Sequence, residues 1–234
     1  EGSRIRFRAD DGVHGLEYWT SDGTLAGTQM VQDINPIGAT SNATSFVKMG
    51  GNTYFIANDA THPPAIWRSD GTVLGTSAIS NIGLNSDWYE GEITNLVATS
   101  NQIFFTAIDP IKRKELFVSD GTLAGTHMVK DINPDNNWCW WCLVQIDSLK
   151  VINNKVVFRA GDSASGREMW VSDGTANGTF MLEDSNPGPT NSDADQFNVV
   201  GSKLSLVREQ RYPSAGYPGL NAILREFLAD EHQP

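Results

Sequence analysis

The octapeptide Ser-Asp-Gly-Thr-x-x-Gly-Thr occurs four times in this chain of 234 residues, at 21–28, 69–76, 119–126 and 172–179. The starts of successive copies lie 48, 50 and 53 residues apart. Repeats of this length indicate stacked supersecondary units, because a single unit cannot bury its apolar face alone. The repeat therefore limits the possible folds more than any other feature of the chain.

The sequence around the octapeptide repeats as well. An aromatic residue stands two positions before each copy, and an apolar run follows each copy. Aromatic side chains bury large apolar areas and dominate protein cores. We interpret the four aromatic residues as core between neighbouring repeats, with ligand binding as the alternative: Trp19, Trp67, Phe117 and Trp170.

Each repeat contains four short strand-like runs separated by turn residues. In the second repeat these runs cover 46–49, 53–57, 66–69 and 77–82. Short apolar runs between clusters of Gly, Asn and Asp are typical of β-strands. Four antiparallel strands in a unit of this length are the signature of a propeller blade. The sequence thus predicts an all-β fold, a small β-propeller with four blades of four antiparallel strands.

The ends of the repeat region determine the number of blades. The first repeat begins at its second strand, residues 5–9, and has no first strand of its own. We expect the run at 197–200 to supply that strand and to close a ring of four blades. The run at 203–207 is then a remnant packed outside, or the sign of a longer array. The predicted propeller domain covers residues 1–207.

Residues 208–234 are predicted to form a linker followed by an amphipathic C-terminal helix. The segment 212–219 is rich in Pro, Gly and Ser. Apolar residues at helical spacing then mark one face of a helix over 219–231: Leu220, Ile223, Leu224, Phe227 and Leu228. Such a stripe must be buried, either on the propeller of the same chain or against an assembly partner.

The charge of the chain excludes some partners. It has 17 Lys and Arg against 28 Asp and Glu, a net charge of -11. This charge repels nucleic acid and anionic membrane surfaces. No apolar run approaches the roughly 18 residues of a membrane helix, so we expect no membrane insertion. The chain starts at Glu1 without Met, which fits a mature product or a fragment.

Glu168-Met169-Trp170-Val171-Ser172-Asp173-Gly174-Thr175 and the segment 115–122 resemble the ELWxxDGT repeat family. The resemblance covers about residues 4–207, and the second repeat departs from it with Ala65 in place of Glu. It implies a β-propeller-like array in a secreted, periplasmic or cell-surface protein of bacteria. It implies no activity, because the family has no single established chemistry.

Aromatic residues also gather in the loops that join the fourth strand of one repeat to the first strand of the next. We predict that they bind a ligand by stacking on sugar rings or entering a protein interface. The alternative is that they cover the propeller core. The residues are Trp88, Tyr89, Trp138, Trp140 and Trp141. Cys139 and Cys142 lie among them, and we expect a disulfide between them rather than a redox or metal site.

Carboxylates recur at two positions of each repeat. The octapeptide Asp is expected to cap its own turn. The loops between second and third strands carry another set, which either caps those loops or holds a Ca²⁺ ion: Asp11, Asp59, Asp109 and Asp162. His14 and His62 lie in matching loops and would join such a metal site.

The favoured function is a non-catalytic secreted or surface binding module for a carbohydrate or a protein. The first alternative is a structural subunit of a larger assembly, attached through its loops or the C-terminal helix. The second is a propeller glycosidase or lyase. Glycosidases need a pair of carboxylates about 5–10 Å apart, and no non-repeated pair stands out in the sequence.

Overall fold

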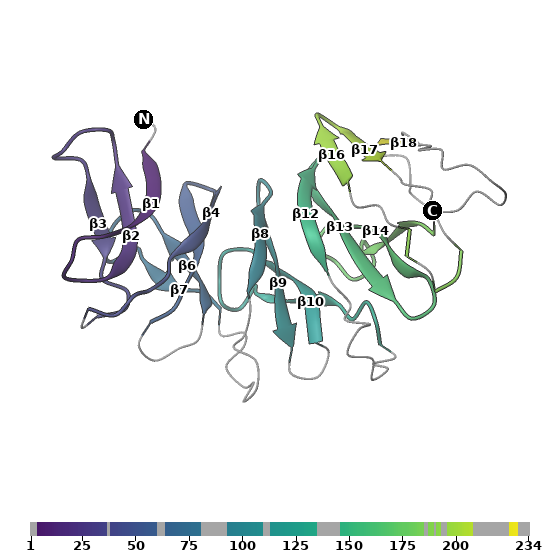
Figure 1. Ribbon diagram of the computed structural model, residues 1–234, viewed down its shortest axis with the longest axis horizontal. Helices are drawn as coiled ribbons and strands as arrows, with labels where there is room; N and C mark the ends of the chain where they lie inside the picture. The colour runs from purple at the N-terminus through teal and green to yellow at the C-terminus, as the bar shows by residue number, and fades with distance from the viewer. Residues whose placement is uncertain are drawn as a thin grey trace, which may run out of the picture. The chain divides into compact units, whose positions relative to one another are not determined.

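The computed structural model describes residues 4–36, 38–59, 64–80, 93–109, 113–134, 146–184, 187–189, 191–192, 196–207 and 225–228 (Figure 1). All regular structure among them is β, in five antiparallel sheets, which confirms an all-β, β-propeller-like fold. No helix in this part of the chain is long and apolar enough to cross a membrane. The chain divides into two compact units, residues 1–128 and 129–234.

The first unit contains the first three sheets, and their strands follow the order of the chain. The first sheet has β1 (Ile5–Asp10), β2 (Leu16–Ser21) and β3 (Gln29–Gln32). The second has β4 (Thr44–Met49), β5 (Asn52–Ala57), β6 (Ala65–Ser69) and β7 (Ser77–Ala78). The third has β8 (Thr94–Ala98), β9 (Ile103–Asp109), β10 (Arg113–Ser119) and β11 (His127–Lys130), which ends in the second unit.

The second unit contains two further sheets built in the same way. One has β12 (Asp147–Ile152), β13 (Lys155–Asp162), β14 (Gly166–Ser172) and β15 (Phe180–Glu183). The other has β16 (Gln196–Val200), β17 (Lys203–Val207) and β18 (Arg225–Leu228). In all five sheets each strand pairs with the strand next to it in the chain.

The first strands of the three four-stranded sheets share a β-bulge after their first residue. The second residue of each strand has a positive φ: 56° at Ser45, 56° at Asn95 and 58° at Ser148. The strand register shifts at each of these positions. A bulge of this kind bends the strand and increases its twist. The repeat thus places the same bulge in each of these three strands.

The apolar core lies between neighbouring sheets. Tyr18 of the first sheet packs on Phe46 and Phe55 of the second, with ring centroids 5.4 and 4.7 Å apart. Phe117 of the third sheet joins a buried cluster with Tyr54 of the second. Trp67, Phe117 and Trp170 are buried and Trp19 is half-buried. The prediction that the aromatic residues before the octapeptide belong to the core is confirmed for the three buried ones.

The predicted closure with four blades is wrong. The strand at 196–200 pairs with β17, not with β1, and forms a fifth sheet. Residues 203–207 are the second strand of that sheet and not a remnant. Gly201 explains the difference, because its φ of +61° suits the two-residue connection between Val200 and Lys203. Closing this local hairpin loses far less chain entropy than pairing with the distant N-terminal strand.

The predicted C-terminal helix is also not found where the structure describes the tail. Arg225–Leu228 is strand β18, and Phe227 lies opposite Leu204 of β17. The segment takes the place of a third strand and hydrogen-bonds the second edge of β17. An isolated helix with one apolar stripe would leave that edge unpaired. Residues 219–224 and 229–231 of the predicted helix lie outside the described residues.

Candidate functional site

The octapeptide folds into a turn that uses its own polar groups. In the fourth copy Asp173 Oδ1 accepts hydrogen bonds from the amide and the hydroxyl of Thr175, both at 2.8 Å. Thr175 Oγ1 accepts from the Gly178 amide at 2.9 Å. Ser172 Oγ accepts from the Gly174 amide at 3.0 Å and lies 2.7 Å from Thr179 Oγ1. The same bonds recur in the other three copies.

The geometry of the turn requires glycine at both glycine positions of the octapeptide. Gly174 has a φ of +93°, a conformation that glycine adopts without steric strain. A Cβ at Gly178 would lie 2.1 Å from Asp173 Oδ1, so only glycine leaves room for the capping carboxylate. All six specified positions are therefore needed by the turn itself. The expected capping role of the octapeptide aspartates is confirmed, and the turn needs no ligand to explain it.

The glutamate that stands two residues before the recurring aromatic residue of the repeat, Glu17 in the first copy, is a second structural carboxylate. Glu17 is fully buried, and its carboxylate accepts hydrogen bonds from the amides of Ile34, Asn35 and Ser41 at 3.0, 3.4 and 3.1 Å. Burial raises the pKa of Glu17, and the hydrogen bonds oppose that rise. Glu17 thus ties the end of the fourth strand to the start of the next repeat.

The other repeats show how general this arrangement is. Glu115 and Glu168 are equally buried at the matching positions. In the second repeat Ala65 replaces the glutamate, and the Ser80 hydroxyl accepts a hydrogen bond from the Ile66 amide instead. The role of this glutamate was not predicted from the sequence. Its recurrence in three of the four repeats was the available signal.

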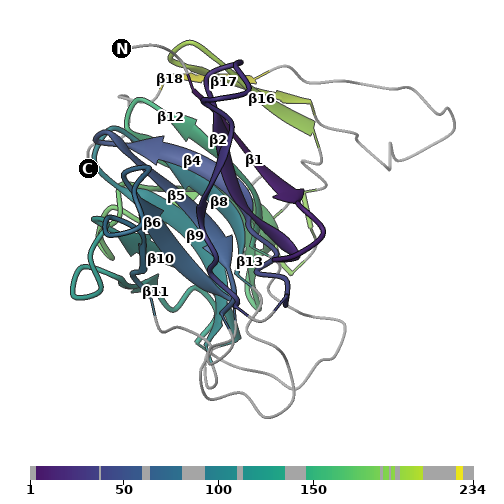
Figure 2. The same cartoon turned by 90° about the vertical axis from the view of Figure 1, so that its left-hand side faces the viewer.

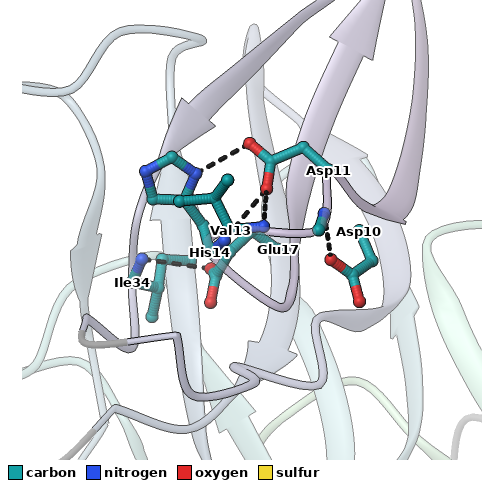
Figure 3. A network of polar contacts seen from close by, with 7 residues as sticks. Asp10, Asp11, Val13, His14, Glu17 and Ile34 are labelled. Atoms are coloured by element: carbon teal, nitrogen blue, oxygen red, sulfur yellow. Dashed lines mark hydrogen bonds and ion pairs between the residues drawn. The ribbon is translucent and has the colours of Figure 1, made fainter.

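Asp11 and His14 form a compact polar loop between β1 and β2 (Figure 3). Asp11 Oδ1 accepts from the amides of Val13 and His14 at 2.9 Å, and Oδ2 lies 2.7 Å from His14 Nδ1. The amide and then the ring of His14 lower the pKa of Asp11 to about 2. The hydrogen bond to Asp11 raises the pKa of His14 in turn.

The predicted calcium ligands whose side chains the structure describes do not form a metal site. Asp11 caps its own loop, and Asp162 does so as well by accepting from the amides of Ala164 and Ser165 at 2.9 and 2.6 Å. Among the described side chains no three His, Cys, Asp or Glu form a group that could hold a metal ion. The side chain of Asp109 and all of His62 lie outside the described residues. The calcium prediction therefore stays a prediction without structural support.

The predicted aromatic ligand-binding residues lie outside the described part of the chain. These are Trp88 and Tyr89 in segment 81–92, and Trp138, Trp140 and Trp141 in segment 135–145 with Cys139 and Cys142. The strands to which the two segments attach are described. One segment enters the third sheet at the start of β8, and the other begins shortly after the end of β11.

The topology of the third sheet relates these two attachment points. In an antiparallel meander of four strands, the start of the first strand and the end of the fourth lie at the same end of the sheet. The strand order β11-β10-β9-β8 is such a meander. The connection from β9 to β10 lies at that end too, while the octapeptide turn from β10 to β11 lies at the opposite end. The two aromatic segments are thus joined to one end of one sheet.

Comparisons with known proteins show the fold alone. No protein-family model matches the chain, and no curated protein matches its sequence. One prolyl endopeptidase structure is 10% identical over 88% of this chain and 30% of the endopeptidase, with a TM-score of 0.53. TolB from Acinetobacter baumannii is 10% identical over 88% of this chain and 48% of TolB, with a TM-score of 0.47. The computationally designed Ika8 protein is 16% identical over 89% of this chain and 53% of its own, with a TM-score of 0.46.

Proposed function

We propose that this chain is a non-catalytic binding module whose two aromatic segments, 81–92 and 135–145, contact a carbohydrate or a protein. The observation that carries the proposal is their attachment to the same end of the β8–β11 sheet. Loops on a regular scaffold are where binding residues concentrate.

The recurring polar residues of the repeat support this assignment, because the fold already accounts for them. The octapeptide carboxylates cap their own turns, and Glu17 binds three backbone amides. These recurring polar groups therefore serve the fold. The aromatic residues of the two segments stand outside the repeat pattern, and a tryptophan suits stacking on a sugar ring or burial in an interface.

The resemblance to the ELWxxDGT family supports a secreted, periplasmic or cell-surface location. A disulfide between Cys139 and Cys142 fits such a compartment and would hold the backbone between Trp138 and Trp141 in one conformation. A rigid loop lowers the entropy lost when it binds a ligand. Structural attachment through the tail is less favoured, because β18 already pairs with β17 in the same chain.

The proposal is tested by replacing Trp140 or Trp141 with alanine. A glycan array and a protein interaction screen first identify the ligand class. If the rings bind the ligand, each variant loses about 2 kcal/mol of binding free energy or more, with little change in stability. Leu74→Ala is the matched control, because Leu74 is fully exposed on an octapeptide turn.

The opposite result would give the tryptophan rings a structural role instead of a binding role. If they cover the core, each variant loses about 3–5 kcal/mol of stability. A large drop in Tm with unchanged affinity for the identified ligand would refute the proposed binding surface.

A further inference from the structure

The fourth octapeptide carries an asparagine at a position where the other three copies have Ala26, Leu74 and Ala124. Asn177 is exposed and precedes Gly178, which makes it the single Asn-Gly pair among the 234 residues. Asparagine loses its side-chain amide most readily before glycine, because glycine has no side chain to hinder attack by its own backbone nitrogen. The fourth turn therefore contains a reactive pair that the other turns lack.

The reaction involves only these two residues and water. The Gly178 nitrogen attacks Cγ of Asn177 and forms a C–N bond, and the side-chain nitrogen leaves as ammonia with the proton of the Gly178 amide. Water then opens the resulting succinimide ring at either of its carbonyl groups. One product is aspartate with an ordinary backbone. The other is isoaspartate, whose backbone runs through the former side chain and is one methylene longer.

The closed turn restrains the attacking nitrogen. The Gly178 amide donates to Thr175 Oγ1 at 2.9 Å, and the Thr175 hydroxyl donates to Asp173 Oδ1 at 2.8 Å. Asn177 can react only when the bond to the Gly178 amide opens. Exposed turns open at a low cost in free energy, because few packed side chains hold them. The rate of the reaction thus depends on how often the fourth turn opens.

Isoaspartate at position 177 does not fit the closed turn. A Cβ on Gly178 would lie 2.1 Å from Asp173 Oδ1, so the backbone here has no room for an added methylene. The longer backbone also moves the Gly178 amide away from Thr175 Oγ1. Thr179 follows directly, and its completely buried hydroxyl lies 2.7 Å from both Ser172 Oγ and the Thr175 carbonyl. The product therefore disrupts the turn that joins β14 to β15.

We propose that Asn177 is a modification site, where the chain converts spontaneously to isoaspartate at a rate set by the opening of the fourth octapeptide turn. Because ammonia is lost, the asparagine does not form again, and each converted molecule keeps a disrupted turn. The conversion also adds a negative charge at this end of the fourth sheet. This inference does not depend on the aromatic segments of the proposed function.

The Asp-Gly pair of each octapeptide is protected against the same reaction. An ionised carboxylate resists attack by an amide nitrogen. The hydroxyl and then the amide of the following threonine lower the pKa of Asp22, Asp70 and Asp120 and so keep these carboxyls ionised. In all four copies the glycine amide donates to the serine hydroxyl at 3.0 or 3.1 Å. The pair 173–174 shares a turn with Asn177 and serves as an internal reference.

The experiment follows the full chain during incubation at neutral pH and physiological temperature. Mass spectrometry of the peptide that contains residues 172–179 measures isoaspartate at position 177 and at position 173. A parallel incubation in guanidinium chloride gives the rates in the unfolded chain. Hydrogen exchange of the β15 amides is compared between fresh and converted protein, because Phe180 and Met181 pair with β14 directly after the turn.

Thr175→Val removes the acceptor of the Gly178 amide. We expect it to speed the conversion of Asn177 in the folded chain about fivefold or more, the effect of one ordinary hydrogen bond on an opening equilibrium. The rate in guanidinium chloride should not change. Thr122→Val is the matched control, because it removes the same bonds from the third turn. That turn joins β10 to β11, which lie side by side in Figure 2, and its loss should leave the rate at Asn177 unchanged.

Ala124→Asn transfers the reactive pair to the third turn. Ala124 is exposed, and the Gly125 amide after it donates to Thr122 Oγ1 at 3.0 Å. Since the two turns have the same bonds, the introduced asparagine should convert in the folded chain at a rate similar to that of Asn177. Thr122→Val in this variant should then speed the reaction in the third turn and not in the fourth.

Two results would overturn the proposal. One is an equal rate at Asn177 in the folded wild type and in folded Thr175→Val, because the turn would then not set the rate. The other is intact Asn177 in both folded chains over a period in which the unfolded chain converts completely. Converted protein whose β15 amides exchange as slowly as those of fresh protein would contradict the expected disruption of the turn.

Discussion

Replacing Gly178 with alanine tests whether the last glycine of the octapeptide is required by the capping aspartate. A Cβ at this position would lie 2.1 Å from Oδ1 and 2.2 Å from Cγ of Asp173. The carboxylate would have to leave its place. Its hydrogen bonds from the amide and hydroxyl of Thr175, both 2.8 Å long, would then be lost.

The size of the effect follows from these contacts. Two hydrogen bonds at about 1 kcal/mol each give a loss of about 2 kcal/mol in the free energy of unfolding. Gly178 does not have a left-handed φ, so the alanine itself regains about 0.4–1 kcal/mol by restricting the unfolded chain. We expect a net loss of about 1–2 kcal/mol, which lowers Tm by about 2–8 °C in a chain of this size.

A double-mutant cycle with Asp173→Ala isolates the cause. Urea unfolding of the wild type, the two single variants and the double variant gives the four free energies. Without the Asp173 carboxylate the Gly178→Ala change should become neutral or stabilising, so the two effects are not additive. If Gly178→Ala destabilises the Asp173→Ala chain as much as the wild type, the carboxylate is not what excludes the side chain.

Two further predictions concern the first repeat. An NMR titration should show the pKa of His14 above 6.5 and should return it toward that value in Asp11→Asn. The charged His14 stabilises the fold below pH 6.5, and this contribution to stability is lost as the pH rises through the raised pKa of His14. The ionised Asp11 stabilises the fold above pH 3.8, and its contribution is lost as the pH falls through the lowered pKa of about 2. Glu17→Ala removes the carboxylate that accepts from the buried amides of Ile34, Asn35 and Ser41, of which the Ser41 amide keeps the Leu16 carbonyl as an acceptor at 3.1 Å. The change should lower the free energy of unfolding by about 2–4 kcal/mol. Leu25→Ala is its control, since Leu25 is 96% exposed and a surface change of this kind stays within about 0.5 kcal/mol; equal effects of the two changes would contradict the role of Glu17.

The sequence predicted what depends on contacts close along the chain. The octapeptide turn, the short strands around it and the all-β class all follow from local patterns, and the structure confirms them. The predicted pairing of 197–200 with the N-terminal strand was wrong because the sequence offered two partners. Gly201 between the two strands was the local signal for the hairpin.

Other features depend on partners that a local pattern does not reveal. The apolar spacing at 220–228 fits a helix, but Arg225–Leu228 pairs with the open edge of β17 and is a strand there. The role of Glu17 depends on amides 17 to 24 residues further along the chain. The predicted aromatic ligand-binding residues and Cys139–Cys142 lie outside the described residues, so that part of the site rests on the sequence alone.

The strand order has a consequence for biosynthesis. Every strand in the five sheets pairs only with strands next to it in the chain. An emerging sheet therefore needs no segment that the ribosome has yet to make, apart from its own last strand. Because domains form as they leave the ribosome, N-terminal part first, we expect each repeat to complete its sheet on the preceding one as soon as it has left the ribosome. Stalled chains from which β7 has left the ribosome should already protect the amides of β4–β6 from hydrogen exchange.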